Sequence, residues 1–519
     1  MKFSAHVTRV ILLMVAASFY LTWKANHASI VFADSLRYIH QAQQFDGGDI
    51  ARALFHAIDH PAYPVAIASA HRMLGGATPE SWQVAAQAAS VVAAVLMAIP
   101  LYLVAAEMFG GATAMLAVVL AYLVPITGQV MGDALSESLF LLFFWWGVWA
   151  AIRFLRSGTF AWLPATVAFA ALAFWVRPEA LLLPAALVAT LAAIPLLRAT
   201  RMDWSRWWAA VAFLVIGPGL LIAPILASKG GLSTKPAVGR LLGTTKASAA
   251  SAVERQRPLD PNQTAAQAGV LAVRAMAMSV RDSVTIPLLP LALVGFALAW
   301  PPGEKSRMWV FLSILMVAWA LALVRLFATG GYCTPRHALI LAYPMIMAAA
   351  FGLKRLLEMV VIPGAAVGQP GERFRLGPIG VLLAVALLGL IYKAENQTPI
   401  NERFAGYRDA AVYLAQHVPP GEKVVDVTGW ALFYGERPGY TFATLVEALG
   451  DRDLTRLVVR DAHLNGPWEY CDWMKRIIGD RKPVAQYPEH PVDKKQSIVF
   501  VYDWSAERQA QAPAPAVVK

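Results

Sequence analysis

Residues 84–106 read VAAQAASVVAAVLMAIPLYLVAA and contain no charged side chain. A transmembrane helix needs about 17 to 25 predominantly apolar residues to cross the hydrocarbon core of a bilayer. This run therefore predicts a membrane-spanning helix. Ten further runs of the same kind lie near residues 9–24, 112–130, 134–153, 161–176, 179–196, 208–227, 284–300, 308–327, 337–353 and 376–393. The chain is predicted to be a polytopic α-helical membrane protein with about 11 transmembrane helices.

The composition of the whole chain supports this prediction. Of its 519 residues, 58% are hydrophobic and 15% are charged, whereas a soluble domain carries about 25% charged residues. The net charge is +11. Lysines and arginines in the loops of a membrane protein explain this charge, because they set its orientation in the membrane and contact anionic lipid. Nucleic acid is therefore not an expected partner. Two cysteines exclude a zinc ribbon, and no phosphate-loop motif indicates an ATP-driven pump.

Lysine and arginine are distributed unevenly between the two sides of the predicted membrane part. With the N-terminus in the cytoplasm, thirteen of them fall in inner segments and two, Arg177 and Arg336, fall in short outer turns. The positive-inside rule favours this orientation. An odd number of spans then places the chain after Tyr392 outside. We expect an integral protein of a membrane such as the bacterial inner membrane, with its C-terminal domain in the periplasm.

The chain divides into a membrane module (residues 1–394), a soluble domain (395–508) and a disordered Ala-Pro tail (509–519). The soluble domain is predicted to be α/β, because an amphipathic helix is followed by short apolar strands. These elements are predicted at residues 403–417, 424–427, 457–459 and 497–502.

Two long outer loops interrupt the membrane module. The first, residues 25–82, is predicted to hold two short amphipathic helices, over 34–45 and 49–58. The second, residues 229–283, is rich in small and basic residues and is predicted to be mobile.

Three carboxylates on the outer side are candidates for catalysis. Asp34 follows the first span closely, where partial desolvation raises the pKa of a carboxyl and suits a general base. Asp133 and Glu137 are four residues apart at the start of a span and share a helix face. Helix capping is the competing interpretation for Asp34 and Asp133. Glu137 is expected at or below the membrane interface, where an ionisable group is usually functional.

Two arginines on the outer side depart from the positive-inside trend. Arg177 lies in Arg177-Pro178-Glu179, between two spans, and Arg336 precedes another span. A guanidinium group suits bidentate recognition of phosphate or carboxylate. Salt bridges to Glu179, Glu137 or Asp133 and snorkelling to lipid headgroups are the alternatives. In the second loop, Lys235 and Arg240 are further candidates for an anionic headgroup, although a solvated loop explains each of them as well.

Several of these motifs together resemble the GT-C class of glycosyltransferases. The class has an acidic residue after the first span, as in Asp34-Ser35-Leu36-Arg37-Tyr38, and then a motif similar to His60-Pro61-Ala62-Tyr63-Pro64. Ser136-Glu137-Ser138, Arg177-Pro178-Glu179 and Arg336 are similar to that class too. The resemblance covers roughly residues 1–395 and is closest to the branch of bacterial aminoarabinose transferase and protein O-mannosyltransferases. The class usually has an acidic doublet in the first loop, whereas Ser35 follows Asp34 here.

The resemblance implies transfer of a hexose or pentose from a polyprenyl-phosphate donor to a glycan, lipid or protein acceptor at the outer face, with inversion. Asp34 would deprotonate or orient the acceptor hydroxyl, alone or with Asp133 or Glu137. Arg177 and Arg336 would neutralise the departing lipid phosphate, so no metal cofactor is expected. Further candidates for substrate binding in the first loop are Tyr38, His60 and Tyr63.

The main alternative is a membrane transporter of an anionic or lipid-linked substrate, because a carboxylate and two guanidinium groups would serve that function too. A transporter is expected to carry its charges near the bilayer midplane, in broken helices of two symmetric halves. Here the candidate charges gather on one side, together with a soluble domain. A non-catalytic scaffold would leave Glu137, Arg177 and Arg336 unexplained.

Overall fold

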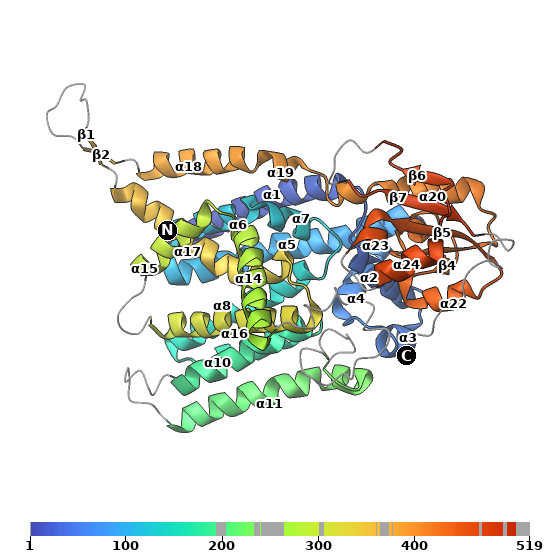
Figure 1. Ribbon diagram of the computed structural model, residues 1–519. Coiled ribbons are helices and arrows are strands. Elements are labelled where there is room, and N and C mark those ends of the chain that lie inside the picture. Colours follow the sequence, from blue (N-terminus) through green and yellow to red (C-terminus); the bar gives the residue numbers. More distant parts are fainter. Residues whose placement is uncertain are drawn as a thin grey trace.

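The computed structural model describes residues 2–193, 204–232, 239, 264–299, 306–359, 361–363, 373–375, 377–466, 470–490 and 496–504. Figure 1 shows a bundle of long helices with the soluble domain at one end. Three helices of the first loop lie between the bundle and this domain, namely α2 (Ala33–Asp46), α3 (Ile50–Phe55) and α4 (Ala62–Leu74). A small hairpin of β1 (Val361–Pro363) and β2 (Arg373–Arg375) lies at the opposite end.

Six helices of the described residues are long and apolar enough to span a membrane. They are α1 (Lys2–Asn26), α5 (Pro79–Phe109), α8 (Glu137–Ser157), α11 (Trp204–Lys229), α16 (Ser306–Gly330) and α17 (Leu339–Met359) with its leading turn η3 (Pro335–Ala338). Two bent pairs raise the number to eight if each is one span. These pairs are α6 (Gly111–Leu123) with α7 (Pro125–Met131), and α14 (Ala265–Val284) with α15 (Leu288–Ala299).

Each predicted apolar run coincides with a helix or a helix pair, so the prediction of a polytopic helical membrane protein is confirmed. The count of 11 spans is not, because six to eight spans pass the length criterion. Three further apolar helices are shorter, namely α9 (Trp162–Phe174), α10 (Leu182–Ala193) after the turn η1 (Pro178–Leu181), and α18 (Gly377–Ile391). A helix of 12 residues rises about 18 Å, against roughly 30 Å of hydrocarbon core.

Small residues let two helices of the bundle approach closely. A Cβ atom on Gly295 of α15 would overlap the backbone carbonyl of Ala348 on α17, and one on Gly352 would overlap the carbonyl of Leu291. Because lipid offers no hydrophobic driving force between helices, such close van der Waals packing is a main source of their association. Replacing either glycine is therefore expected to force α15 and α17 apart.

The second predicted loop, residues 229–283, contains a helix that was not predicted from the sequence. Helix α14 occupies residues predicted to be mobile and makes an angle of 94° with α15. It crosses α16 in Figure 1 and contacts α16, α17 and η3. The capping box of Thr264 with Gln267 fixes its start. These contacts matter because η3 carries Arg336.

The soluble domain is α/β, as predicted. Its five-stranded sheet has the order β4-β3-β5-β7-β6, in which β3 is parallel to β4 and β5, and β7 is antiparallel to β5 and β6. The strands are β3 (Lys423–Asp426), β4 (Gly439–Tyr440), β5 (Leu454–Arg460), β6 (Ala485–Tyr487) and β7 (Val499–Asp503). The helices and turns around them are α19 (Lys393–Gln397), η4 (Glu402–Phe404), α20 (Gly406–His417), α21 (Trp430–Tyr434), η5 (Phe442–Thr444), α22 (Leu445–Leu449), α23 (Asp461–Asn465) and α24 (Tyr470–Ile478).

Both cysteines are free thiols. Cys471 is buried in the soluble domain, where its Sγ lies 3.5 Å from the carbonyl oxygen of Ala462. Cys333 lies beside α14, where its carbonyl accepts a hydrogen bond from Ser279 Oγ at 3.1 Å.

Candidate active site

Asp34 lies in the first turn of α2, and Phe32 rather than Asp34 is the N-cap residue of that helix. The capping interpretation of Asp34 is therefore wrong. Its Oδ2 accepts a hydrogen bond from Arg336 Nη2 at 2.7 Å, and its Oδ1 lies 3.1 Å from Arg37 Nη1. The side chain is 24% exposed. Asp34 is thus an ion-paired carboxylate that solvent still reaches.

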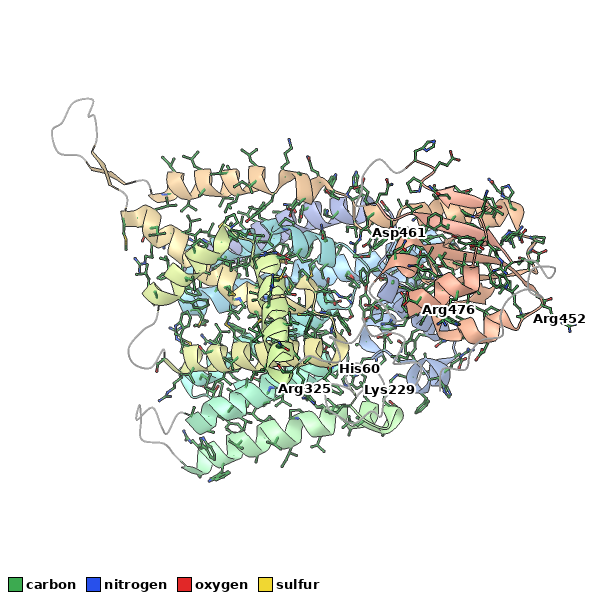
Figure 2. All side chains as sticks on the ribbon, viewed as in Figure 1. His60, Lys229, Arg325, Arg452, Asp461 and Arg476 are labelled. Carbon is green, nitrogen blue, oxygen red and sulfur yellow. The ribbon has the colours of Figure 1, made fainter. Side chains whose placement is uncertain are left out.

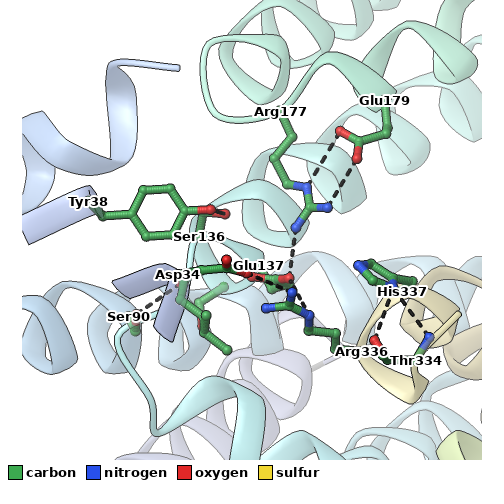
Figure 3. A network of polar contacts seen from close by, with 12 residues as sticks. Asp34, Tyr38, Ser90, Ser136, Glu137, Arg177, Glu179, Thr334, Arg336 and His337 are labelled. Carbon is green, nitrogen blue, oxygen red and sulfur yellow. Dashed lines mark hydrogen bonds and ion pairs between the residues drawn. The ribbon is translucent and has the colours of Figure 1, made fainter. Parts of the chain in front are cut away.

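Glu137 is the first residue of α8 and lies between two arginines (Figure 3). Arg177 Nη1 donates to its Oε1 at 2.7 Å, and Arg336 Nε lies 3.8 Å from the same oxygen. Arg177 also bonds Glu179 at 3.0 Å. Burial opposes the charge of Arg177, but the carboxylates of Glu179 and Glu137 raise its pKa well above the usual value. The salt bridges considered for Arg177 and for Arg336 to Glu137 are therefore present.

Helix α14 holds the turn that carries Arg336. Ser283 Oγ donates to the carbonyl of Pro335 at 2.7 Å. Trp319 Nε1 of α16 donates to the carbonyl of His337 at 2.9 Å. The guanidinium carbon of Arg336 lies 4.6 Å from the centre of the Phe32 ring, directly before α2. Arg336 is thus fixed from three elements and connects α17 to the first loop.

Two buried polar atoms at the centre of this cluster have no hydrogen-bond partner among the described residues, namely Glu137 Oε2 and Arg336 Nε. Buried polar atoms in proteins are nearly always bonded, and exceptions are often found at catalytic sites. An acceptor and a donor therefore remain available at the point where Asp34, Glu137 and Arg336 meet.

Asp133 lies in the turn between α7 and α8 and is 2% exposed. Its Oδ1 accepts hydrogen bonds from the backbone N–H groups of Ala134 at 2.7 Å and Phe32 at 3.3 Å. Its Oδ2 accepts one from Asn401 Nδ2 at 2.8 Å. Burial raises the pKa of Asp133 to about 6, and these donors oppose the shift. The N-cap residue of α8 is Ser136, so Asp133 is not a cap. It joins three chain segments instead.

The other predicted residues of the first loop face the interior of the protein. The hydroxyl of Tyr38 is bonded to Ser136 Oγ at 3.1 Å. The hydroxyl of Tyr63 lies 2.7 Å from Ser90 Oγ, and the ring nitrogen Nδ1 of His60 lies 2.7 Å from the carbonyl of Phe174. All three side chains are buried. Substrate binding by these residues stays a prediction that their positions do not support.

Of the basic residues in the second loop, the structure describes only some. Lys235 and Arg240 lie outside the described residues. Lys229, at the end of α11, donates to the carbonyl of Ala57 in the first loop. Figure 2 places Lys229 and His60 near the end of the bundle that faces the soluble domain. Within the described ranges, no group of three or more His, Cys, Asp or Glu side chains is arranged to hold a metal ion.

The sequence did not point to three residues of the site, namely Arg37, Asp59 and Asn401. Arg37 bonds Asp59 at 3.1 Å and pairs with Asp34. Asn401 bonds Asp133. Because burial lowers the pKa of Arg37 less than the carboxylates of Asp34 and Asp59 raise it, that pKa lies above its usual value. The pair of Arg37 with Asp34 has a signal in the sequence, since residues three apart on a helix are neighbours.

Comparisons with known proteins bear on the fold of the chain. The family model described as dolichyl-phosphate-mannose-protein mannosyltransferase matches residues 59–222. ArnT from Cupriavidus metallidurans bound to undecaprenyl phosphate superposes with a TM-score of 0.59 at 14% identity, over 95% of this chain and 97% of ArnT. The fold is that of the GT-C class of glycosyltransferases.

A second GT-C structure supports the same fold. The oligosaccharyltransferase AglB from Archaeoglobus fulgidus, in complex with an inhibitory peptide and a dolichol-phosphate, gives a TM-score of 0.59 at 11% identity, over 98% of this chain and 77% of AglB. No curated protein matches the chain in sequence. The GT-C likeness extends beyond residues 1–395, because these superpositions cover most of the soluble domain as well.

Proposed function

We propose that the chain is an inverting glycosyltransferase that moves a sugar from a polyprenyl-phosphate donor to an acceptor hydroxyl at the outer face of the membrane. The observation that carries this proposal is the 2.7 Å ion pair between Asp34 and Arg336, residues 302 positions apart. It puts a candidate base beside a candidate phosphate-binding cation. The structures of ArnT with undecaprenyl phosphate and AglB with a dolichol-phosphate support a lipid-phosphate donor.

The charges of the site suit a phosphate leaving group. Arg336 pairs with Asp34 and has an Nε–H without an acceptor among the described residues. A donor phosphate would compete with Asp34 for this guanidinium group, since both are oxyanions that match its geometry. Binding of the donor would then release Asp34 to accept a proton. Glu137, held by Arg177, would keep Arg336 in place during this exchange.

The reaction follows from these positions. The acceptor oxygen forms a bond to the anomeric carbon while the bond from that carbon to the phosphate oxygen breaks, which inverts the centre. The hydroxyl proton passes to Asp34, and the electron pair of the broken bond leaves on the lipid phosphate. Donors placed where negative charge develops are usually the largest catalytic contribution. Arg336 fills that role, with Arg177 behind it.

The orientation is part of the proposal. The first loop and the soluble domain lie at the same end of the bundle (Figure 1). The positive-inside count assigns this end to the outer face. We therefore place the N-terminus in the cytoplasm and the soluble domain in the periplasm of a bacterial cell.

The test uses the purified full-length chain and radiolabelled polyprenyl-phosphate sugars, with release of polyprenyl phosphate as the signal. Asp34→Asn is expected to lower kcat by about 10²- to 10⁴-fold, the usual contribution of a general base. Asp49→Asn is a matched control in the same loop. Asp49 caps α3 by accepting from the N–H of Arg52 at 3.2 Å, and asparagine caps a helix equally well.

Two results would contradict the proposal. Normal turnover by Asp34→Asn, with active wild-type protein, would exclude Asp34 as the base. If the wild type releases no polyprenyl phosphate from any donor but exchanges a soluble anion across proteoliposome membranes, the chain is a transporter.

A further inference from the structure

Four of the six residues that connect α1 to α2, Ser29–Phe32, form no regular secondary structure, yet each has a hydrogen bond to another part of the chain. The N–H of Ser29 donates to the carbonyl of Ile400 at 3.0 Å. Its carbonyl accepts from Arg408 Nε at 2.5 Å. The carbonyl of Ile30 accepts from Asn401 Nδ2 at 3.0 Å. These partners belong to the soluble domain, residues 395–508.

Val31 is held on both sides by a single short helix of that domain. Its N–H donates to the hydroxyl of Tyr434 at 3.0 Å, and its carbonyl accepts from Trp430 Nε1 at 2.8 Å. Both aromatic residues belong to α21. Ile30 and Val31 are fully buried, and Trp430 is buried too. The soluble domain therefore not only buries this part of the connection but also forms hydrogen bonds with its backbone.

Phe32 connects this hydrogen-bonded segment to the candidate active site. Its N–H is bonded to Asp133, which also accepts from Asn401. Its ring lies against the guanidinium group of Arg336, which in turn pairs with Asp34. Asn401 has a left-handed backbone, with φ of 57°, a conformation that asparagine adopts more readily than most residues. Asn401 thereby donates to Ile30 and to Asp133 at once.

We infer that the soluble domain positions the catalytic loop, with Trp430, Tyr434 and Asn401 as positioning residues for Asp34. A base must be held close to the productive geometry, because small displacements reduce the rate strongly. The bonds to Ser29–Phe32 set where α2 begins and hence where Asp34 lies relative to Arg336. The domain thus acts as part of the active-site framework.

The experiment removes the hydrogen bonds to Val31 and keeps an aromatic ring at each position. Trp430→Phe removes the donor to the carbonyl of Val31. Tyr434→Phe removes the acceptor of its N–H, together with the bond from the same hydroxyl to Gln83. Trp473→Phe on α24 and Tyr413→Phe on α20 are the matched controls in the same domain. Trp473 packs against the core of that domain, and the Tyr413 ring stacks on His417 of its own helix.

Hydrogen exchange gives a readout that needs no activity. In peptides covering Ser29–Phe32, exchange in Trp430→Phe and Tyr434→Phe is expected to be about five- to tenfold faster, as for the loss of one hydrogen bond. Exchange in both control variants is expected to match the wild type. Unchanged exchange in both test variants would overturn the inference, whatever the enzyme does.

The kinetic readout rests on the proposed function. Trp430→Phe and Tyr434→Phe are expected to lower kcat about five- to tenfold with an unchanged KM for the lipid donor. The acidic limb of the pH profile is expected to move to higher pH as Asp34 loses its alignment with Arg336. Full kcat and an unmoved pH profile in both test variants, beside an inactive Asp34→Asn, would overturn the inference and leave the proposed function standing. A wild-type protein without turnover would contradict the proposed function. Hydrogen exchange would still show whether Trp430 and Tyr434 hold the connection Ser29–Phe32 in place.

Discussion

Asp34 and Asp133 lie at the same end of the helix bundle, but their carboxylates have different partners. The oxygens of Asp34 meet the guanidinium groups of Arg336 and Arg37, and its side chain is 24% exposed. The oxygens of Asp133 meet two backbone N–H groups and the amide of Asn401, and the residue is 2% exposed. One aspartate has cationic partners within reach of solvent, and the other has neutral partners within the protein.

This difference distinguishes two candidate roles that the sequence left open for both aspartates. A guanidinium partner can exchange its carboxylate for a phosphate without breaking the fold, since the interaction is between two charged side chains and involves no backbone group. The donors to Asp133 are parts of the backbone and a buried amide, and losing them would expose unpaired groups. We therefore propose Asp34 for the chemistry and Asp133 for the joining of segments.

Among the partners of the two aspartates, the largest effect is expected for Arg336→Gln. This change removes the closest cation from Asp34 and one of two cations near Glu137. Loss of a group that stabilises transition-state charge costs about 10²- to 10³-fold in kcat. The measurement is release of polyprenyl phosphate, with Arg336→Lys expected to retain part of the rate.

Arg355→Gln is the matched control for Arg336→Gln. Arg355 is an exposed residue of α17, and it pairs with Glu358 on the same helix. Its variant is expected to turn over like the wild type. If Arg336→Gln kept full kcat as well, cationic partners would not be what distinguishes Asp34 from Asp133.

Asp133→Asn is expected to change stability more than catalysis. The folded protein raises the pKa of Asp133 from 3.8 to about 6. The folded state therefore binds the proton more tightly than the unfolded state, and stability falls as pH rises from about 4 through 6. Between pH 5 and pH 7 the wild type is expected to lose about 1 kcal/mol, because one pKa unit corresponds to about 1.4 kcal/mol.

Thermal unfolding in detergent at pH 5 and pH 7 measures this effect. In Asp133→Asn the loss of stability between the two pH values is expected to be smaller by that amount. The turnover of this variant is expected to fall by at most about tenfold, as for one lost hydrogen bond near the site. An inactive Asp133→Asn with the stability profile of the wild type would show that Asp133 takes part in the chemistry.

The sequence predicted those features that depend on local patterns. The apolar runs predicted the helices, and an amphipathic helix followed by short apolar strands predicted the α/β domain. Asp34, Glu137, Arg177 and Arg336 were identified because each is a charge beside an apolar run. The structure brings these four side chains into one cluster (Figure 3).

The missed features depend on contacts between distant segments. Asn401 is an ordinary polar residue in the sequence, and its role exists only because the soluble domain docks on Ser29–Phe32. Helix α14 was assigned to a mobile loop because its alanines and charged residues give no continuous apolar run. The motif in the first loop predicts His60 and Tyr63 as substrate ligands, but packing of this loop against α5 and α9 buries both side chains. Hydropathy and motif spacing carry no information on such docking.

The smallest effect is expected for Arg37→Gln. Arg37 is 45% exposed in its pair with Asp34, and exposed ion pairs contribute about 0 to 1 kcal/mol. Asp34 keeps Arg336, so kcat/KM is expected to fall by at most about fivefold. Salt screens exposed charges, so the difference from the wild type is expected to shrink when kcat/KM is measured at about 1 M salt. A loss as large as that of Arg336→Gln would mean that both guanidinium groups act equally on Asp34, and that the pair of Asp34 with Arg336 alone does not define the site.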